Sequence, residues 1–203
     1  MDSNYYNTKE SVDEYIKLAK DVNGAQLIEK LKKILNSGSL VLEMGSGPGS
    51  DWKILSGHYR VIGSDNSTEF LNRLIIDNPN GEFVNLDAIT LTTDKKFDGI
   101  YSNKVLHHLK DKELESSIIR QYKILHHNGI ICHSFWKGTG TEIHKGIFVN
   151  YHTDSDLKNI FDKYFDILIL EEYKEFEDND SILLIGKKKQ QHHNPSSFGF
   201  ATD

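Results

Sequence analysis

Cysteine and proline are scarce in this sequence, and it carries no surplus of positive charge. The single cysteine, Cys132, excludes an internal disulfide and a zinc site built from cysteines. Lys and Arg number 24 against 30 Asp and Glu, so the formal net charge of −6 disfavours wholesale binding to nucleic acid or to an anionic membrane. A small neutral or cationic partner suits this charge better.

Long hydrophobic runs are missing as well. No stretch approaches the roughly 18 apolar residues that a membrane-spanning helix needs. The opening residues, MDSNYYNTKE, lack the basic and apolar regions of a signal peptide. Together with the lone cysteine, these absences predict a soluble cytoplasmic protein without a membrane partner. The 203 residues are 37% hydrophobic and 27% charged, which is typical of one folded domain.

Short apolar runs alternate along the chain with segments of helical periodicity. The apolar runs predict strands at residues 40–43, 59–63, 82–86, 97–101 and 129–135. The periodic segments predict helices at 11–20, 25–35, 51–55, 68–76, 112–126 and 154–163, the last with Thr153 as its N-cap. This order predicts parallel strands joined by right-handed helical crossovers.

The C-terminal part departs from this alternation. Two strand-like runs, 165–176 and 181–187, flank a polar turn and predict an antiparallel hairpin. The expected fold is therefore α/β, a Rossmann-like three-layer sandwich whose seven-stranded sheet is mostly parallel. We divide the chain into an N-terminal segment with a lid helix (1–22), one domain (23–188) and a flexible tail (189–203).

The most informative segment is a glycine-rich turn between the first strand of the domain and a helix. It places Gly45, Gly47 and Gly49 at alternate positions around Ser46, so that backbone N–H groups can approach a ligand closely. Glycine-rich turns also occur for structural reasons alone. The residues that follow favour the ligand interpretation.

Acidic residues follow the next two strands. Asp65, with Asn66 beside it, stands where a doubly wound sheet binds the two hydroxyls of a ribose, although an Asp here also suits a helix N-cap. Asp87 follows the next strand and can accept a hydrogen bond from the amine of an adenine lying against Ala88; the alternative is a solvated loop residue. The three strand ends thus predict an adenosine site with a polar tail.

Two residues bear on the identity of that tail. A dinucleotide fingerprint requires a third glycine at position 50, where this chain has Ser50. Glu43 stands two residues before the loop, and it would repel a pyrophosphate but attract an ammonium and a sulfonium. A nicotinamide-dependent reductase is accordingly disfavoured.

With these motifs in order, the sequence resembles a class I S-adenosylmethionine-dependent methyltransferase of the small-molecule type. The resemblance covers roughly residues 10 to 188 and includes the segment FDGIYSNKVLHHL that starts at Phe97. It implies S-adenosyl-L-methionine as cofactor, with the methionine part over the glycine loop, ribose on Asp65 and adenine near Asp87. It also implies that Asn103 and Lys104 line the methionine side.

The acceptor side is less defined by sequence. His107 and His108 are candidate catalytic bases, with packing or helix capping as the alternative. Trp136 and Tyr151 can form an aromatic wall, and Tyr15 of the lid helix is a third candidate substrate contact; core packing is the alternative for the wall. Residues 137–141 are expected to form a mobile loop, and His126 and His127 to end the long helix.

The function that follows is methyl transfer to an O, N or S atom of a small molecule, with no metal. A DNA or protein amide acceptor is disfavoured, because residues 102–105 read Ser-Asn-Lys-Val rather than Asn/Asp-Pro-Pro-aromatic, and no recognition domain is added. The alternative is a non-catalytic S-adenosylmethionine-binding module that acts through a partner, since no residue is identified firmly as catalytic.

Overall fold

The computed structural model describes residues 6, 8–20, 22–144 and 146–190. The predicted flexible tail therefore lies almost wholly outside the described residues. The helices are α1 (Lys9–Leu18), α2 (Ala25–Leu31), α3 (Ser50–Ser56), α4 (Thr68–Asp77), α5 (Asp111–Ile124) and α6 (Asp154–Phe161). The strands are β1 (Leu40–Met44), β2 (Arg60–Asp65), β3 (Glu82–Asn85), β4 (Phe97–Asn103), β5 (Leu125–Trp136), β6 (Thr141–His144), β7 (Ile147–Asn150), β8 (Phe165–Tyr173) and β9 (Ser181–Lys188).

The main sheet has seven strands in the order β3-β2-β1-β4-β5-β9-β8. The first five are parallel to one another, whereas β9 pairs antiparallel with both β5 and β8. This confirms the expected α/β fold and its C-terminal hairpin. The chain order reverses at β1, where β2 lies on one side and β4 on the other, and such a switch point is where doubly wound sheets bind ligands.

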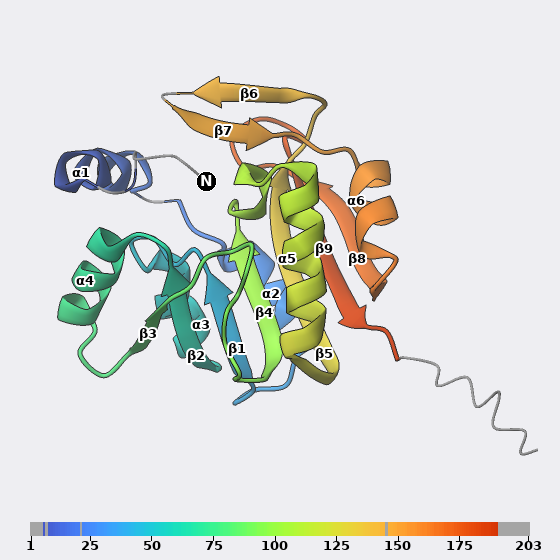
Figure 1. The fold of residues 1–203 in the computed structure, drawn as a ribbon, viewed down its shortest axis with the longest axis horizontal. Helices are drawn as coiled ribbons and strands as arrows, with labels where there is room; N and C mark the ends of the chain where they lie inside the picture. The colour runs from blue at the N-terminus through green and yellow to red at the C-terminus, as the bar shows by residue number, and fades with distance from the viewer. Residues whose placement is uncertain (1–5, 7, 21, 145, 191–203) are drawn as a thin grey trace, which may run out of the picture.

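Both faces of the sheet are covered, which explains why its central strands are apolar without alternation. Figure 1 shows α5 and α6 in front of the sheet, with α2 and α3 behind it. Successive side chains of one strand enter different cores, because strand residues alternate between faces. The core under α5 and α6 includes Leu42, Ile100, Ile131 and Leu184. The core under α2 and α3 includes Val41, Tyr101, Cys132 and Leu183.

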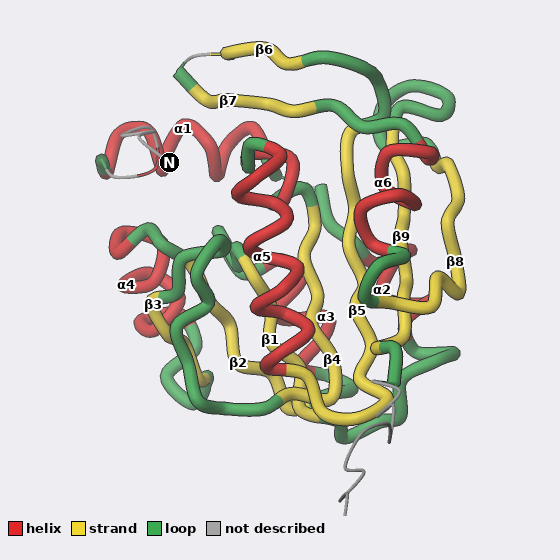
Figure 2. Tube along the Cα trace, turned by 45° about the vertical axis from the view of Figure 1, so that its right-hand side comes forward, coloured by secondary structure: helices red, strands yellow, loops and turns green. Residues whose placement is uncertain are grey.

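The carboxyl ends of the parallel strands are overhung by two further elements. In Figure 1, α1 and the two-stranded β6–β7 sheet lie beyond that end of the main sheet, and the turned view of Figure 2 agrees. Arg73 of α4 fixes α1 through an ion pair with Asp13 at 2.6 Å and also pairs with Glu69. This ion pair ties α1 to α4.

Two segments differ from the sequence-based expectations. The long helix ends at Ile124, and Leu125 is already extended with ψ 141°, so His126 and His127 lie exposed in β5 rather than at a helix end. Strands β6 and β7 form an unpredicted hairpin, whose turn includes Gly146 at φ +80°.

Among the described helices, none is long and apolar enough to cross a membrane.

Candidate functional site

The glycine loop connects β1 to α3 through left-handed backbone. Gly45, Gly47 and Gly49 have φ values of +69°, +48° and +81°, which side-chain-bearing residues rarely adopt. A Cβ on Gly45 would lie 2.5 Å from a methyl of Val105, whereas a Cβ on Gly47 would meet nothing nearer than Tyr15, at 4.0 Å. Gly45 is thus packed against protein, while Gly47 faces open space.

Glu43 is buried directly beneath this loop, with 2% of its surface exposed. The Ser46 hydroxyl donates to its Oε2 at 2.6 Å. Burial raises the pKa of Glu43 to about 8, and the nearby carboxylates of Asp51 and Asp65 act in the same direction. Its charge is therefore sensitive to any cation that enters the loop.

Asp65 ends β2 and supports the loop from the side. Its Oδ2 accepts from the Gly47 N–H and its Oδ1 from the Ser67 N–H, each at 2.9 Å. The N-cap of α4 is Ser67, whose hydroxyl accepts from Phe70, so the capping alternative for Asp65 does not hold. Burial raises the pKa of Asp65, partly opposed by these backbone donors.

A buried cluster around Asp51 was missed by the sequence reasoning. The Asp51 carboxylate accepts from the Gly24 N–H at 2.6 Å, from the Tyr101 hydroxyl at 2.7 Å and from Asn103 Nδ2 at 3.1 Å. It therefore joins the start of α3 to the segment before α2 and to β4. The available signal was an acid at the second position of the helix that follows the glycine loop.

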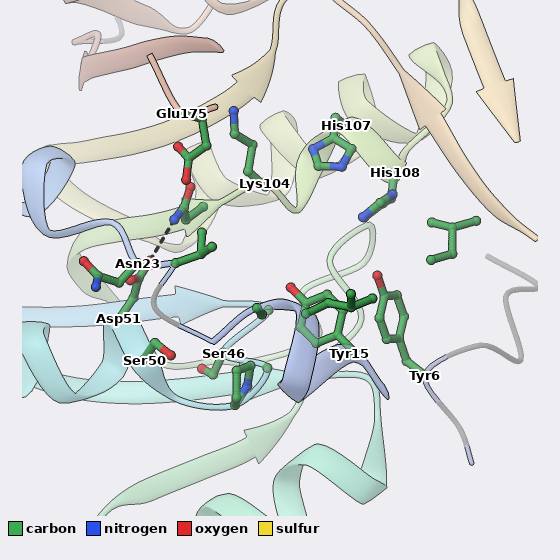
Figure 3. Close-up of a pocket in the computed structure, with 18 of the residues that line it drawn as sticks. Tyr6, Tyr15, Asn23, Ser46, Ser50, Asp51, Lys104, His107, His108 and Glu175 are labelled. Carbon is green, nitrogen blue, oxygen red and sulfur yellow. Dashed lines mark hydrogen bonds between the residues drawn. The ribbon is translucent and has the colours of Figure 1, made fainter. Parts of the chain in front are cut away.

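A cavity of about 360 Å³ opens above the loop and continues into a smaller one of about 100 Å³. Figure 3 shows Lys104 and His107 across the larger cavity from Ser46 and Ser50. Tyr6 and Tyr15 line both cavities, and their rings meet edge to face with centroids 5.4 Å apart. Tyr15 of α1 and Tyr6, which precedes α1, thus form part of the wall of both cavities.

The smaller cavity brings together many of the residues expected to bind the cofactor. Those that line it are Gly45, Gly47, Asp65, Asn66, Ala88, Asn103 and Lys104. Asp87 is not among the described residues lining either cavity, and its Oδ1 accepts from the N–H groups of Ile89 and Thr90 at 2.9 Å each. Its structural contact is a turn of its own loop.

The histidine pair occupies a short 3₁₀ helix, Leu106–His108, directly after β4. His108 lies at both cavities and donates through Nδ1 to the Phe148 carbonyl oxygen at 2.8 Å. His107 is 2% exposed and lines the larger cavity, and its Nδ1 has no hydrogen-bond partner among the described residues. Burial lowers the pKa of both imidazoles, which favours their neutral forms.

The expected aromatic wall forms with a different partner. Trp136 lines the larger cavity and stacks on Phe176 with ring centroids 5.9 Å apart. Tyr151 is not found among the described lining residues, and its hydroxyl donates to Glu142 at 2.6 Å. Sequence analysis did not identify Phe176 as a cavity residue because it placed Phe176 at the end of the predicted strand 165–176, whereas β8 ends at Tyr173.

Lys104 stands beside Trp136 in an unusual backbone conformation, with φ +54°. Its Nζ donates to the Phe135 carbonyl oxygen at 3.0 Å and to the Ser181 hydroxyl at 2.6 Å, and lies 3.7 Å from the centroid of the Trp136 ring. Burial lowers the pKa of Lys104 to about 7. This side chain therefore links the end of β4 to the aromatic wall.

Comparison with known proteins agrees with this geometry. Residues 41–129 match the family model described as a methyltransferase domain. This part of the chain is therefore similar to the methyltransferase-domain family. A search of curated proteins finds no match to the sequence.

Solved structures extend the likeness to nearly the whole chain. The Burkholderia thailandensis 1,6-didemethyltoxoflavin-N1-methyltransferase, solved with its substrate and S-adenosylhomocysteine, aligns at TM-score 0.75 and 18% identity over 89% of this chain and 85% of its own. The N-methyltransferase NodS of Bradyrhizobium japonicum, in complex with S-adenosylhomocysteine, gives 0.70 and 17% over 91% and 100%. A methyltransferase bound to the Haloferax volcanii Trm112 activator gives 0.73 and 15% over 91% and 97%. At these low identities the TM-scores show a shared fold and no more.

The hairpin β6–β7 contributes residues to the larger cavity that sequence periodicity did not reveal. His144, Ile147 and Val149 line the larger cavity from this hairpin. The glycines at 138 and 140 suggested a loop, and the strands of the hairpin are only four residues each.

Within the described residues, no cluster of three or more His, Cys, Asp or Glu side chains is arranged to hold a metal ion.

Proposed function

We propose that this protein is a methyltransferase that uses S-adenosylmethionine to methylate an O, N or S atom of a small molecule. The observation that carries the proposal is the continuous cavity: glycine loop and Asp65 at one end, Trp136 and the histidine pair at the other. When bound, S-adenosylmethionine supplies an electrophilic methyl group on a sulfonium. The remaining requirements are alignment of the acceptor and exclusion of water.

The described residues fit such a cofactor. Gly47 leaves the space that a side chain would fill, and its N–H already turns toward the Asp65 carboxylate. Asp65 can accept hydrogen bonds from ribose hydroxyls through lone pairs that its two backbone donors leave free. Glu43, nearly neutral when alone, becomes a carboxylate beside a cationic tail, because an opposite charge favours ionisation.

The acceptor end has groups for positioning and for proton removal. Trp136 offers a flat apolar face, and Tyr15 closes the cavity from the lid helix. His107 and His108 are held neutral by burial and are therefore able to take a proton from an acceptor that needs to lose one. Asp87 remains a proposed adenine ligand through the carboxylate oxygen that does not bind its own turn.

Calorimetry with S-adenosylhomocysteine tests the cofactor assignment. The wild-type protein should bind it, and Asp65→Asn should weaken binding about tenfold or more, because a hydrogen bond to a charged group is lost and a donor is introduced. Asp166→Ala, which changes an exposed carboxylate on β8, is the matched control and should bind like wild type. A folded wild-type protein that ignores S-adenosylhomocysteine at high micromolar concentration would refute the proposal.

A second candidate is a S-adenosylmethionine-binding module that works with a partner. One observation favours it, the structural likeness to a methyltransferase solved as a complex with its Trm112 activator. Turnover by the purified chain alone with any member of a small-molecule acceptor panel would exclude this candidate. Binding of S-adenosylhomocysteine without turnover, restored by a cell extract depleted of small molecules, would support it.

A further inference from the structure

The charge of Lys104 has no direct counter-ion among the described residues. Two of its three N–H groups are used by the Phe135 carbonyl oxygen and the Ser181 hydroxyl. Within the described part of the chain, no Asp or Glu oxygen lies within the 4.0 Å of Nζ that defines an ion pair. Two acids act on it from beyond that distance: Glu175, and Asp180, to which the Ser181 hydroxyl donates onward at 2.8 Å. A largely buried ammonium in this state is costly unless an anion joins it.

Charged groups are divided between the two ends of the larger cavity. Glu43 and Asp51 lie at the glycine loop, whereas Lys104, His107, His108 and His144 lie on the walls beyond it. Glu175 is the acid of those far walls, and burial raises its pKa, which reduces its charge. The end of the cavity at the glycine loop, where we propose the cofactor tail to lie, is therefore acidic. The opposite end presents the Lys104 ammonium and imidazoles.

The groups at that opposite end surround a flat surface. The Lys104 ammonium lies 3.7 Å from the centroid of the Trp136 ring, and the His107 ring centroid lies 6.4 Å from it. Phe176 stacks on the same indole at an interplanar angle of 24°. An ammonium held over an indole ring, with further aromatic side chains beside it, fits a planar molecule that carries a negative charge.

We infer that the Lys104–Trp136–His107 wall binds a planar acceptor carrying an ionised oxygen, a carboxylate or a phenolate, with that oxygen at Lys104 Nζ. The inference rests on the proposed function, since it names the class of acceptor for the same cavity. The remaining Lys104 donor and the ligand oxygen form the ion pair that the protein itself lacks. A cationic acceptor is excluded from this end by the same charge.

Three benzene derivatives of similar size but different charge separate the possibilities: benzoate, benzamide and benzylamine. Their affinities are measured by calorimetry or ligand-observed NMR on wild-type protein saturated with S-adenosylhomocysteine. Benzoate should bind about tenfold or more tighter than benzamide, as one hydrogen bond between charged partners provides, and benzylamine should bind weakest. Equal affinities, a preference for benzylamine, or no binding of any probe at 10 mM, about the weakest affinity of interest, would overturn the inference.

Variants assign the preference to Lys104. Lys104→Met should abolish the preference for benzoate over benzamide, and Lys104→Arg should retain that preference. Lys137→Met is the control, because Lys137 is paired with Glu172 and is not among the described lining residues. A Lys104→Met protein that still prefers benzoate would contradict the assignment.

A second variant covers the case in which Lys104→Met does not fold. Glu175→Gln removes the acid of the same wall, so benzoate affinity should rise while benzamide affinity stays the same; an unchanged or weaker benzoate affinity counts against the inference. Binding of S-adenosylhomocysteine is measured first in every sample. Its failure in wild type refutes the proposed function, whereas its success without a benzoate preference refutes only the acceptor class.

Discussion

Replacing Gly24 by alanine should destabilise the protein strongly, although this glycine has an ordinary negative φ of −88°. A Cβ at this position would collide with the Tyr101 hydroxyl and would lie 2.7 Å from Asp51 Oδ2 and 3.1 Å from Asn103 Nδ2. None of these atoms is free to move, because all three belong to the buried hydrogen-bonded cluster of Asp51. The glycine is required by close approach rather than by its backbone angles.

The cost follows from the contacts that must break. Forcing a methyl group into a packed site costs about 1–3 kcal/mol. Displacing the Tyr101 hydroxyl from the Asp51 carboxylate loses a hydrogen bond to a charged group, which costs about 1.5–3 kcal/mol. The free energy of unfolding of Gly24→Ala should therefore fall by about 3–5 kcal/mol.

Urea denaturation followed by tryptophan fluorescence measures this change as a lower midpoint at constant slope. The matched control is Gly57→Ala at the end of α3, where a Cβ would meet only the Ile54 carbonyl oxygen at an ordinary 3.5 Å. That variant should be neutral or stabilised by up to about 1 kcal/mol. A Gly24→Ala protein within about 1 kcal/mol of wild type would refute the packing argument.

Two further predictions concern buried titratable groups. Burial raises the pKa of Glu43 from its ordinary 4.5 to about 8, so between these pH values the native state retains a proton that the unfolded chain has lost. The free energy of unfolding should therefore fall as the pH rises from 4.5 to about 8. Glu43→Gln should remove this pH dependence in urea titrations at several pH values. His133, whose pKa burial lowers to about 3, bonds Ser102 and Gln121 through its two ring nitrogens at 2.8 Å each. His133→Phe removes the partner of the Ser102 hydroxyl and of Gln121 Oε1 and should lower the free energy of unfolding by about 2–5 kcal/mol in thermal or urea unfolding. The affinity for S-adenosylhomocysteine should stay unchanged. A loss of that affinity in a folded variant would contradict a purely structural role.

The sequence predicted the order of the elements and most of their limits, because local signals determine both. The Thr153 cap is an example: its hydroxyl accepts from the Asp156 N–H, and the Asp156 carboxylate accepts from the Thr153 N–H, as the spacing indicated. The end of α5 was predicted wrongly because His126 continues the helical pattern, whereas Leu125 pairs with Phe97 in the sheet. Sheet pairing of that kind is a long-range contact that periodicity does not contain.

The sequence by itself indicated the glycine loop, Asp65 and the alternation of strands and helices, since each depends on residue type and on local periodicity. Only the tertiary structure decided the order of the strands in the sheet and which side chains share the cavity. It placed Phe176 rather than Tyr151 against Trp136, added the β6–β7 hairpin to the wall, and left Lys104 without a direct counter-ion among the described residues. These contacts join segments tens of residues apart, and packing in three dimensions alone fixes them.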